Sequence, residues 1–134
     1  MIVEDNRADV YLLKEALHQA KIDFTALVFE DGESALRYVE SEAGRGGKPI
    51  PDLAILDLNV PKRDGSELLT HIRRTPGLRE IPVVMLSSSP KRVMLEQAAQ
   101  ADCYIVKPCE LNEFLQIGEQ IRECVNAIQA TGIL

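Results

Sequence analysis

Apolar residues gather in five short runs along the chain, separated by segments of mixed polarity. Each run is nearly continuous in apolar residues and does not alternate with polar ones. Continuous runs are typical of parallel strands that are covered on both faces. We therefore predict five buried strands: Met1–Glu4, Thr25–Phe29, Asp52–Leu56, Val83–Leu86 and Cys103–Val106.

Between these runs, apolar residues recur at the spacing of amphipathic helices. The stripes are Val10, Leu13, Leu17 and Ala20; Ala35, Leu36 and Val39; Leu68, Leu69 and Ile72; Val93, Met94, Ala98 and Ala101; and a last stripe from Leu111 to Ile128. The last stripe predicts one helix of about five turns. The alternation of strands and helices favours an α/β fold, a doubly wound (βα)5 with a five-stranded parallel sheet.

Length and composition limit the classes of protein. The 134 residues suffice for a single domain, 1–134, and the net charge of -6 argues against nucleic-acid and anionic membrane partners. We find no apolar run long enough to span a membrane and no signal peptide at the amino end. Three scattered cysteines without metal-site spacing indicate a reducing, cytoplasmic location, with Cys103, Cys109 and Cys124 as packing residues or inert thiols.

Chemically informative side chains follow the predicted strands. Glu4 and Asp5 follow the first strand, Asp57 the third, Ser87 the fourth and Lys107 the fifth. Parallel strands end at the same edge of a sheet, and ligands bind at that edge. We therefore expect three carboxylates, a hydroxyl and an ammonium group to lie close together.

Three adjacent carboxylates cannot all stay ionised without a cation or raised pKa values. Hard oxygen ligands in an open arrangement suit Mg2+, which keeps several waters and leaves a position for a phosphoryl oxygen. The ammonium of Lys107 and the hydroxyl of Ser87 supply the charge and the hydrogen bond that transfer of a phosphoryl group onto Asp57 needs.

Four motifs in order along nearly the whole chain resemble the receiver domain of two-component response regulators. They are Val3-Glu4-Asp5-Asn6, Leu56-Asp57-Leu58-Asn59-Val60-Pro61-Lys62-Arg63-Asp64-Gly65, Leu86-Ser87-Ser88-Ser89 and Tyr104-Ile105-Val106-Lys107-Pro108. The loop before Pro51-Asp52 and the Cys103-Tyr104-Ile105 run look most like the single-domain regulators that partner cyanobacterial and bacterial phytochromes.

The resemblance implies a flavodoxin-like fold with strand order 2-1-3-4-5 and a role for each matching residue. Asp57 is the phosphorylation site, and Glu4, Asp5, Asp57 and the backbone carbonyl of Asn59 hold Mg2+. Lys107 pairs with the phosphate, Ser87 and Tyr104 form the switch, and the side chains of Asn59 and Ser89 tune hydrolysis. A sensor histidine kinase, of phytochrome type by the subfamily likeness, donates the phosphoryl group. The chain is then a phospho-acceptor that promotes its own phosphorylation and slow dephosphorylation, not an enzyme acting on a separate substrate.

Further expectations concern output and departures from the family pattern. Signalling is expected through a surface of the fourth helix, fifth strand and fifth helix, with a homodimer along Ile117, Ile121, Cys124 and Ile128. A cis peptide is expected before Pro108, where the chain turns into the last helix. Compared with the family pattern, Glu4 stands where aspartate is commoner and Ser87 where threonine is commoner. The stretch from Ser89 to Tyr104 is shorter than in the family and lacks the customary glycine before the fifth strand.

Alternative functions remain open at this point. The principal one is a pseudo-receiver, a phosphorylation-independent protein-interaction module, which the altered fourth helix would suit. An aspartate-nucleophile phosphohydrolase needs a second acid two residues after its nucleophile, where this chain has Asn59. A DNA-binding regulator would need a further domain, and no helix-turn-helix follows Leu134 in this sequence.

Overall fold

A five-stranded parallel sheet forms the centre of the computed structural model, which describes residues 1–41, 50–62, 65–88 and 101–132. The strand order is β2-β1-β3-β4-β5, so the predicted fold and topology are confirmed. Strands β1 and β2 have only two residues each, fewer than their apolar runs suggested. The strands are β1 (Ile2–Val3), β2 (Val28–Phe29), β3 (Ala54–Asp57), β4 (Val83–Ser87) and β5 (Cys103–Val106).

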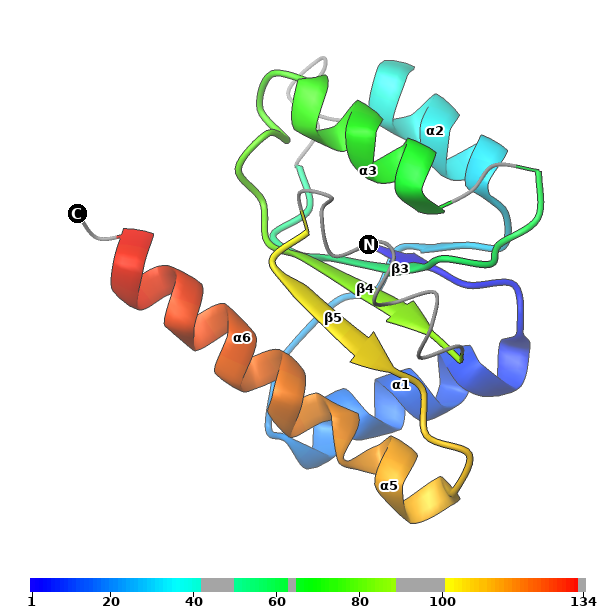
Figure 1. The fold of residues 1–134 in the computed structure, drawn as a ribbon, viewed down its shortest axis with the longest axis vertical. Helices are drawn as coiled ribbons and strands as arrows, with labels where there is room; N and C mark the ends of the chain where they lie inside the picture. The colour runs from blue at the N-terminus through cyan, green and yellow to red at the C-terminus, as the bar shows by residue number, and fades with distance from the viewer. Residues whose placement is uncertain (42–49, 63–64, 89–100, 133–134) are drawn as a thin grey trace.

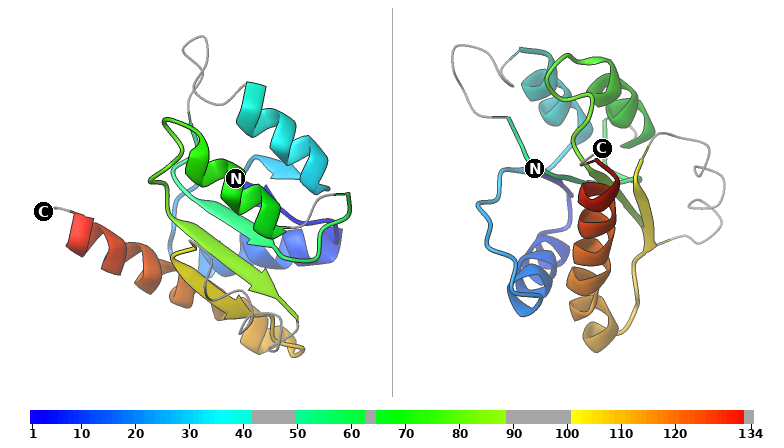
Figure 2. Two further views of the ribbon diagram at one scale, coloured as in Figure 1. Left: turned by 45° about the horizontal axis from the view of Figure 1, so that its top comes forward. Right: turned by 90° about the vertical axis from the view of Figure 1, so that its left-hand side faces the viewer.

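Helices cover both faces of the sheet, giving three layers (Figures 1 and 2). On one face lie α2 (Gly32–Ser41) and α3 (Gly65–Arg74), and on the other lie α1 (Arg7–Gln19), α5 (Leu111–Leu115) and α6 (Ile117–Gly132). Each face buries its own apolar cluster, because every central strand points alternate side chains to opposite sides. The predicted fourth helix falls on residues 89–100, which lie outside the described residues.

The last helix is divided, where we predicted a continuous one. Gln116 separates α5 from α6, and its backbone N–H donates to the carbonyl of Glu113 three residues earlier. This tighter turn interrupts the regular α-helical hydrogen bonding between residues four apart, and the same side of the helix continues to face the sheet. The apolar periodicity runs through the break, which is why the sequence pattern did not reveal it.

Helix α6 packs very closely against α1 (Figure 1). A Cβ placed on Gly118 would lie 2.1 Å from the carbonyl oxygen of Ala16, so only glycine fits at this crossing. Ile117 and Ile121 are fully buried beside it, and Cys124 is buried one turn later. The stripe that we predicted as a dimer surface is therefore occupied, for these three residues, by packing inside the domain. Helical spacing alone could not say which apolar stripe would face α1.

The cysteines also differ from our expectation. Cys103 of β5 and Cys124 of α6 form a disulfide, with 6.4 Å between their Cα atoms, and only Cys109 is a free thiol. The two residues are 21 positions apart in the chain, so their adjacency arises from the packing of α6 against β5. In the described part of the chain, no helix is both long and apolar enough to cross a bilayer.

Candidate functional site

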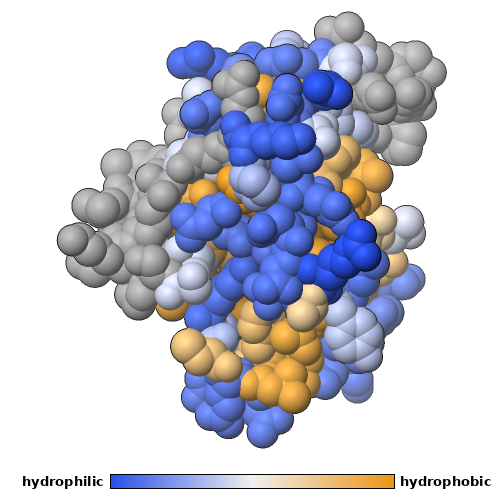
Figure 3. Space-filling model, turned by 90° about the vertical axis from the view of Figure 1, so that its right-hand side faces the viewer, coloured by the Kyte–Doolittle hydropathy of each residue, from blue (hydrophilic) through white to orange (hydrophobic). Residues whose placement is uncertain are grey.

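Polar side chains meet at the carboxyl edge of the sheet, as the strand ends predicted. Glu4 follows β1, Asp57 and Ser87 are the last residues of β3 and β4, and Lys107 follows β5. Glu4, Asp57 and Ser87 are the buried polar or charged residues among those described. Around them the surface on this side of the molecule is largely hydrophilic (Figure 3). A cluster of buried ionisable groups at the switch edge of an α/β sheet is the expected position of a functional site.

The ammonium of Lys107 joins three carboxylates. Its Nζ donates to Glu4 Oε2 at 2.6 Å, to Asp57 Oδ2 at 2.8 Å and to Asp9 Oδ2 at 2.9 Å. The backbone N–H of Lys107 donates to the carbonyl of Ser87 at 2.7 Å, which fixes where its side chain begins. The structure thus brings together Glu4, Asp57 and Lys107 as predicted and adds Asp9 to them.

Sequence reasoning missed Asp9. It lies in the first turn of α1, where the Asn6 side chain caps the helix by accepting from the N–H groups of Ala8 and Asp9. An acid in a first turn is ordinary, because it complements the helix dipole. The available signal was its position four residues after Asp5, which brings it around to the carboxyl edge.

The carboxylates differ in how readily they ionise. Burial, followed by a hydrogen bond to Asp57, raises the pKa of Glu4 to about 8. Burial would also raise the pKa of Asp57, but bonds with Glu4, Lys107 and the Asn59 N–H outweigh it and hold that pKa below its usual value. For Lys107 the three carboxylates outweigh burial and raise its pKa. Near neutral pH the site therefore holds an ionised Asp57, an ammonium and a Glu4 that retains much of its proton.

Three carboxylates at this edge fit a divalent cation. Glu4, Asp5 and Asp57 each offer an oxygen, and these oxygens all lie within 4.8 Å of one another. Asp5 is exposed, so one side of the set is open to water. Hard carboxylate oxygens with an open side suit Mg2+ or Mn2+, both of which accept several water ligands. Crowding with Asp57 adds to the effect of burial on the pKa of Glu4, and Lys107 offsets only part of it.

The loop after β3 positions the Asp57 carboxylate. The backbone N–H of Asn59 donates to Asp57 Oδ1 at 2.9 Å, while the other oxygen faces Lys107. Where α3 begins, a Cβ on Gly65 would lie 2.6 Å from the carbonyl oxygen of Asp57. Glycine therefore lets α3 start directly against this loop and restrict its movement.

The remaining predicted site residues differ in how deeply they are buried. Ser87 is fully buried at the end of β4, and Tyr104 is half-buried on β5, packed against the cluster under α2 and α3. Asn59 is exposed beside Asp57, and Ser89 lies outside the described residues.

The bond between Lys107 and Pro108 is trans, and our prediction of a cis bond was wrong. Three residues, Pro108 to Glu110, separate Lys107 from the first residue of α5. This length of chain is enough to turn from β5 into the helix without a cis bond.

Comparison with known proteins agrees with this geometry. The model of the response regulator receiver domain matches residues 1–119. The chain belongs to the response regulator receiver family. Response regulator Rcp1 of Synechocystis is 33% identical over 123 residues, which cover 90% of this chain and 84% of Rcp1.

Two solved structures of receivers are similar to this one. The phosphorylated cyanobacterial phytochrome response regulator RcpA is 38% identical, with a TM-score of 0.79 over 91% of this chain and 89% of RcpA. The Mn2+-bound form of Rcp1 is 34% identical, with a TM-score of 0.76 over 90% of this chain and 88% of Rcp1. This receiver domain is thus homologous to phytochrome response regulators, as the motifs suggested.

Proposed function

We propose that this receiver accepts a phosphoryl group on Asp57, with Mg2+ held beside it, in a two-component phosphorelay. One observation carries the proposal: Asp57 is only 6% exposed, with one oxygen fixed by the Asn59 N–H and the other facing Lys107. The same bonds hold the pKa of Asp57 below its usual value. A buried carboxylate held by two donors at a strand end is a positioned nucleophile.

The chemical step follows from the positions of these groups. A carboxylate oxygen of Asp57 attacks phosphorus, the bond from phosphorus to the donor's histidine nitrogen breaks, and its electron pair leaves with that nitrogen. Lys107 exchanges its bond to Asp57 for one to a phosphoryl oxygen, where its charge offsets the charge of the transferring group. The hydroxyl of Ser87 donates a hydrogen bond to another phosphoryl oxygen.

Residues for the metal are available in the same place. Glu4, Asp5, Asp57 and the backbone carbonyl of Asn59 would hold Mg2+, which when bound neutralises negative charge on the phosphoryl oxygens. A Mn2+-bound structure of the homologous Rcp1 supports this assignment. Asn59, exposed beside Asp57, and Ser89 are proposed to tune the later attack of water on the acyl phosphate.

The proposed donor is a sensor histidine kinase of phytochrome type, since RcpA and Rcp1 are the similar proteins. Large exposed apolar side chains lie on elements that also lead to the site: Tyr11 on α1, Val106 at the end of β5 and Leu111 at the start of α5. An apolar area is visible among polar residues toward the α1 and α5 end of the molecule (Figure 3). Such an area suits docking of a partner. The absence of nucleic-acid and membrane partners belongs to the same proposal, supported by the net charge of -6, and so does a cytoplasmic location.

Output is proposed through Ser87 and Tyr104. Phosphorylation would draw the Ser87 hydroxyl toward Asp57 and let the half-buried Tyr104 ring move inward behind β4. A homodimer through the fourth helix, β5 and α6, tightened by phosphorylation, stays a prediction. Its α6 contribution would come from the exposed polar residues of that helix, such as Glu119 and Glu123, because three of the four residues of the apolar stripe are buried.

Acetyl phosphate tests the proposal directly. Incubation with this donor and Mg2+ is expected to add one phosphoryl group by intact-protein mass, and Asp57→Asn is expected to abolish the addition. Asp52→Asn makes the same change at an exposed residue before β3, at the opposite edge, and should be labelled like the wild type. Equal labelling of the Asp57 variant would overturn the assignment. A wild type that is never labelled, by acetyl phosphate or by a kinase, would favour the pseudo-receiver alternative.

A further inference from the structure

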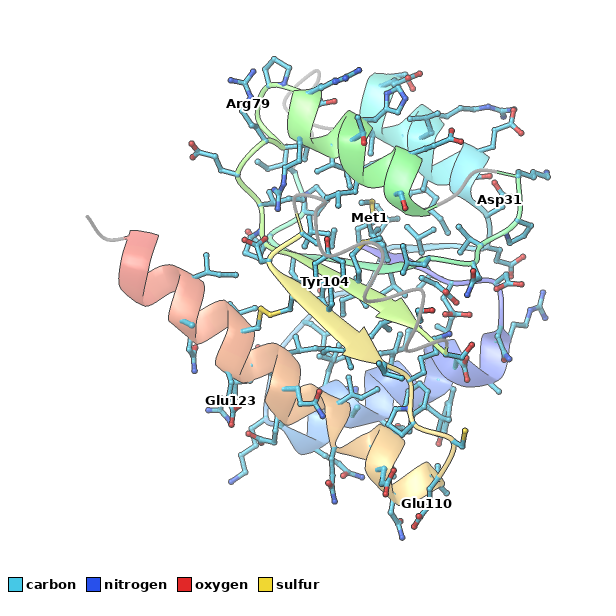
Figure 4. All side chains as sticks on the ribbon, in the orientation of Figure 1. Met1, Asp31, Arg79, Tyr104, Glu110 and Glu123 are labelled. Carbon is cyan, nitrogen blue, oxygen red and sulfur yellow. A yellow bond between two sulfur atoms is a disulfide. The ribbon has the colours of Figure 1, made fainter. Side chains whose placement is uncertain are left out.

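The disulfide joins β5, the strand that carries Tyr104, to α6. It runs from Cys103 on β5 to Cys124 on α6 (yellow in Figure 4, where Tyr104 is labelled). Along β5 the side chains alternate between faces. Cys103 and Ile105 pack in the cluster on the α6 side, and Tyr104 packs in the cluster on the opposite side. The cross-link therefore restrains the strand that carries the proposed switch residue, from the face opposite that residue.

The bond also marks a change in how tightly α6 is held. Before it, Ile117, Gly118 and Ile121 are buried against α1 and the sheet. After it, Val125 and Ile128 are only partly buried, and the side chains between them are exposed. Strand β5 is an edge strand, bonded on one side to β4. A covalent bond between an edge strand and a weakly packed half-helix restricts two elements that otherwise have freedom to move.

We propose that Cys103 and Cys124 form a reversible, redox-controlled disulfide that regulates the β5–α6 surface of this receiver. The regulatory role rests on the proposed function, because it takes that surface as the output and the cytoplasm as the location. In a reducing compartment, a disulfide between two cysteines of one domain is usually transient and redox-sensing. Cys103 is partly exposed, so a small thiol or disulfide can reach it, whereas Cys124 is 9% exposed.

Oxidised glutathione supplies the chemistry as co-reactant. The Cys103 thiolate attacks one glutathione sulfur, the glutathione disulfide bond breaks, and one glutathione thiolate leaves. The Cys124 thiolate then attacks the Cys103 sulfur of the mixed disulfide and releases the second glutathione. Two protein thiols are oxidised, one oxidised glutathione is reduced to two thiols, and the two thiol protons pass to solvent or to the leaving thiolates. Reduction is the reverse of these steps.

A redox titration of the full chain tests the bond itself. The protein is equilibrated with glutathione buffers from fully reduced to fully oxidised, quenched in acid and alkylated, and its mass is measured. We expect a transition from three alkylated thiols to a form with the internal disulfide, in which the exposed Cys109 is alkylated or carries one glutathione. In Cys109→Ser we expect two alkylated thiols in the reduced protein and none in the oxidised protein, with the same midpoint potential as the wild type. A pair that stays reduced in oxidised glutathione, or oxidised after prolonged reduction, would overturn the proposal.

A second measurement tests the regulatory consequence. Amide hydrogen exchange in residues 124–128 is expected to become about tenfold faster on reduction, and equally fast in the Cys103→Ser, Cys124→Ser double variant in either buffer. Exchange that is unchanged by reduction would overturn the regulatory role. Asp57→Asn should give the same redox titration as the wild type, so a failure of the proposed phosphorylation is distinguishable from a failure of the redox proposal.

Discussion

The carboxylate of Asp9 lies 2.9 Å from the ammonium of Lys107, although 98 residues separate the two in the chain. Glu4 and Asp57, which also bind Lys107, belong to the set that fits a cation. Asp9 lies outside that set. It therefore offers Lys107 a partner that stays available when a cation takes over the other two carboxylates.

We predict that Asp9→Asn weakens Mg2+ binding. Without the Asp9 carboxylate, Lys107 keeps only partners that the cation also needs, and the site loses one negative charge. A hydrogen bond to a charged group contributes about 1.5 kcal/mol, so we expect about tenfold weaker binding. Isothermal titration calorimetry with Mg2+ measures this affinity. Asp23→Asn, the same change at an exposed residue beyond the other end of α1, should bind like the wild type. Wild-type affinity in the Asp9 variant would contradict this role.

The pH dependence of the metal-free protein follows from Glu4. Burial and Asp57 raise its pKa from 4.5 to about 8, so the folded state binds this proton more tightly than the unfolded state. The resulting stabilisation is complete below the unfolded pKa and is lost as pH rises through about 8. Asp57, with a lowered pKa, stays ionised over this range. Urea unfolding should therefore give decreasing stability from about pH 5 to pH 8, with a shallower slope in Glu4→Gln.

Mg2+ should show the opposite trend. A cation binds the ionised form of Glu4, so Mg2+ affinity is expected to rise between about pH 6 and pH 8 as that proton is lost. Calorimetry at several pH values, in buffers of different ionisation enthalpy, would also count the protons released on binding. Affinity that does not change with pH in the wild type would argue against Glu4 as a ligand.

Gly118→Ala should destabilise the domain, although alanine favours a helix by about 1 kcal/mol over glycine. The added Cβ would lie 2.1 Å from the carbonyl oxygen of Ala16, and backbone must move to relieve the clash. Overpacking of this kind costs about 1–3 kcal/mol, so after the gain in helix propensity we expect a net loss of up to about 2 kcal/mol by urea unfolding. Gln120→Ala, on the exposed side of the same helix, should change stability little. A stabilised Gly118 variant would mean that α1 and α6 are less closely packed.

Reduction of the disulfide should also lower stability. A cross-link between residues 21 positions apart is expected to contribute about 3 kcal/mol by restricting the unfolded chain. For a domain of this size, that corresponds to a melting temperature lower by about 10 °C. Scanning calorimetry with and without a reductant measures this shift in melting temperature. Cys109→Ser should melt like the wild type under both conditions, and the same melting temperature with and without reductant would contradict the prediction.

Local sequence patterns were sufficient for the elements of the sheet and for most of the site. Apolar runs and helical stripes indicated five parallel strands and the helices that cover them, and the resemblance of the motifs to receiver domains supplied the strand order. Because parallel strands end at one edge, the positions of Glu4, Asp57, Ser87 and Lys107 after their strands were enough to place them together.

Which residues meet across two elements follows from the packing of the folded domain. The Asp9–Lys107 ion pair, the contact of Gly118 with Ala16 and the disulfide of Cys103 with Cys124 join segments 98, 102 and 21 residues apart. The trans bond before Pro108 was likewise fixed by the path of the chain between β5 and α5. Periodicity tells which face of a helix is apolar, but the rotation and distance of one packed helix relative to another depend on how all side chains between them fit.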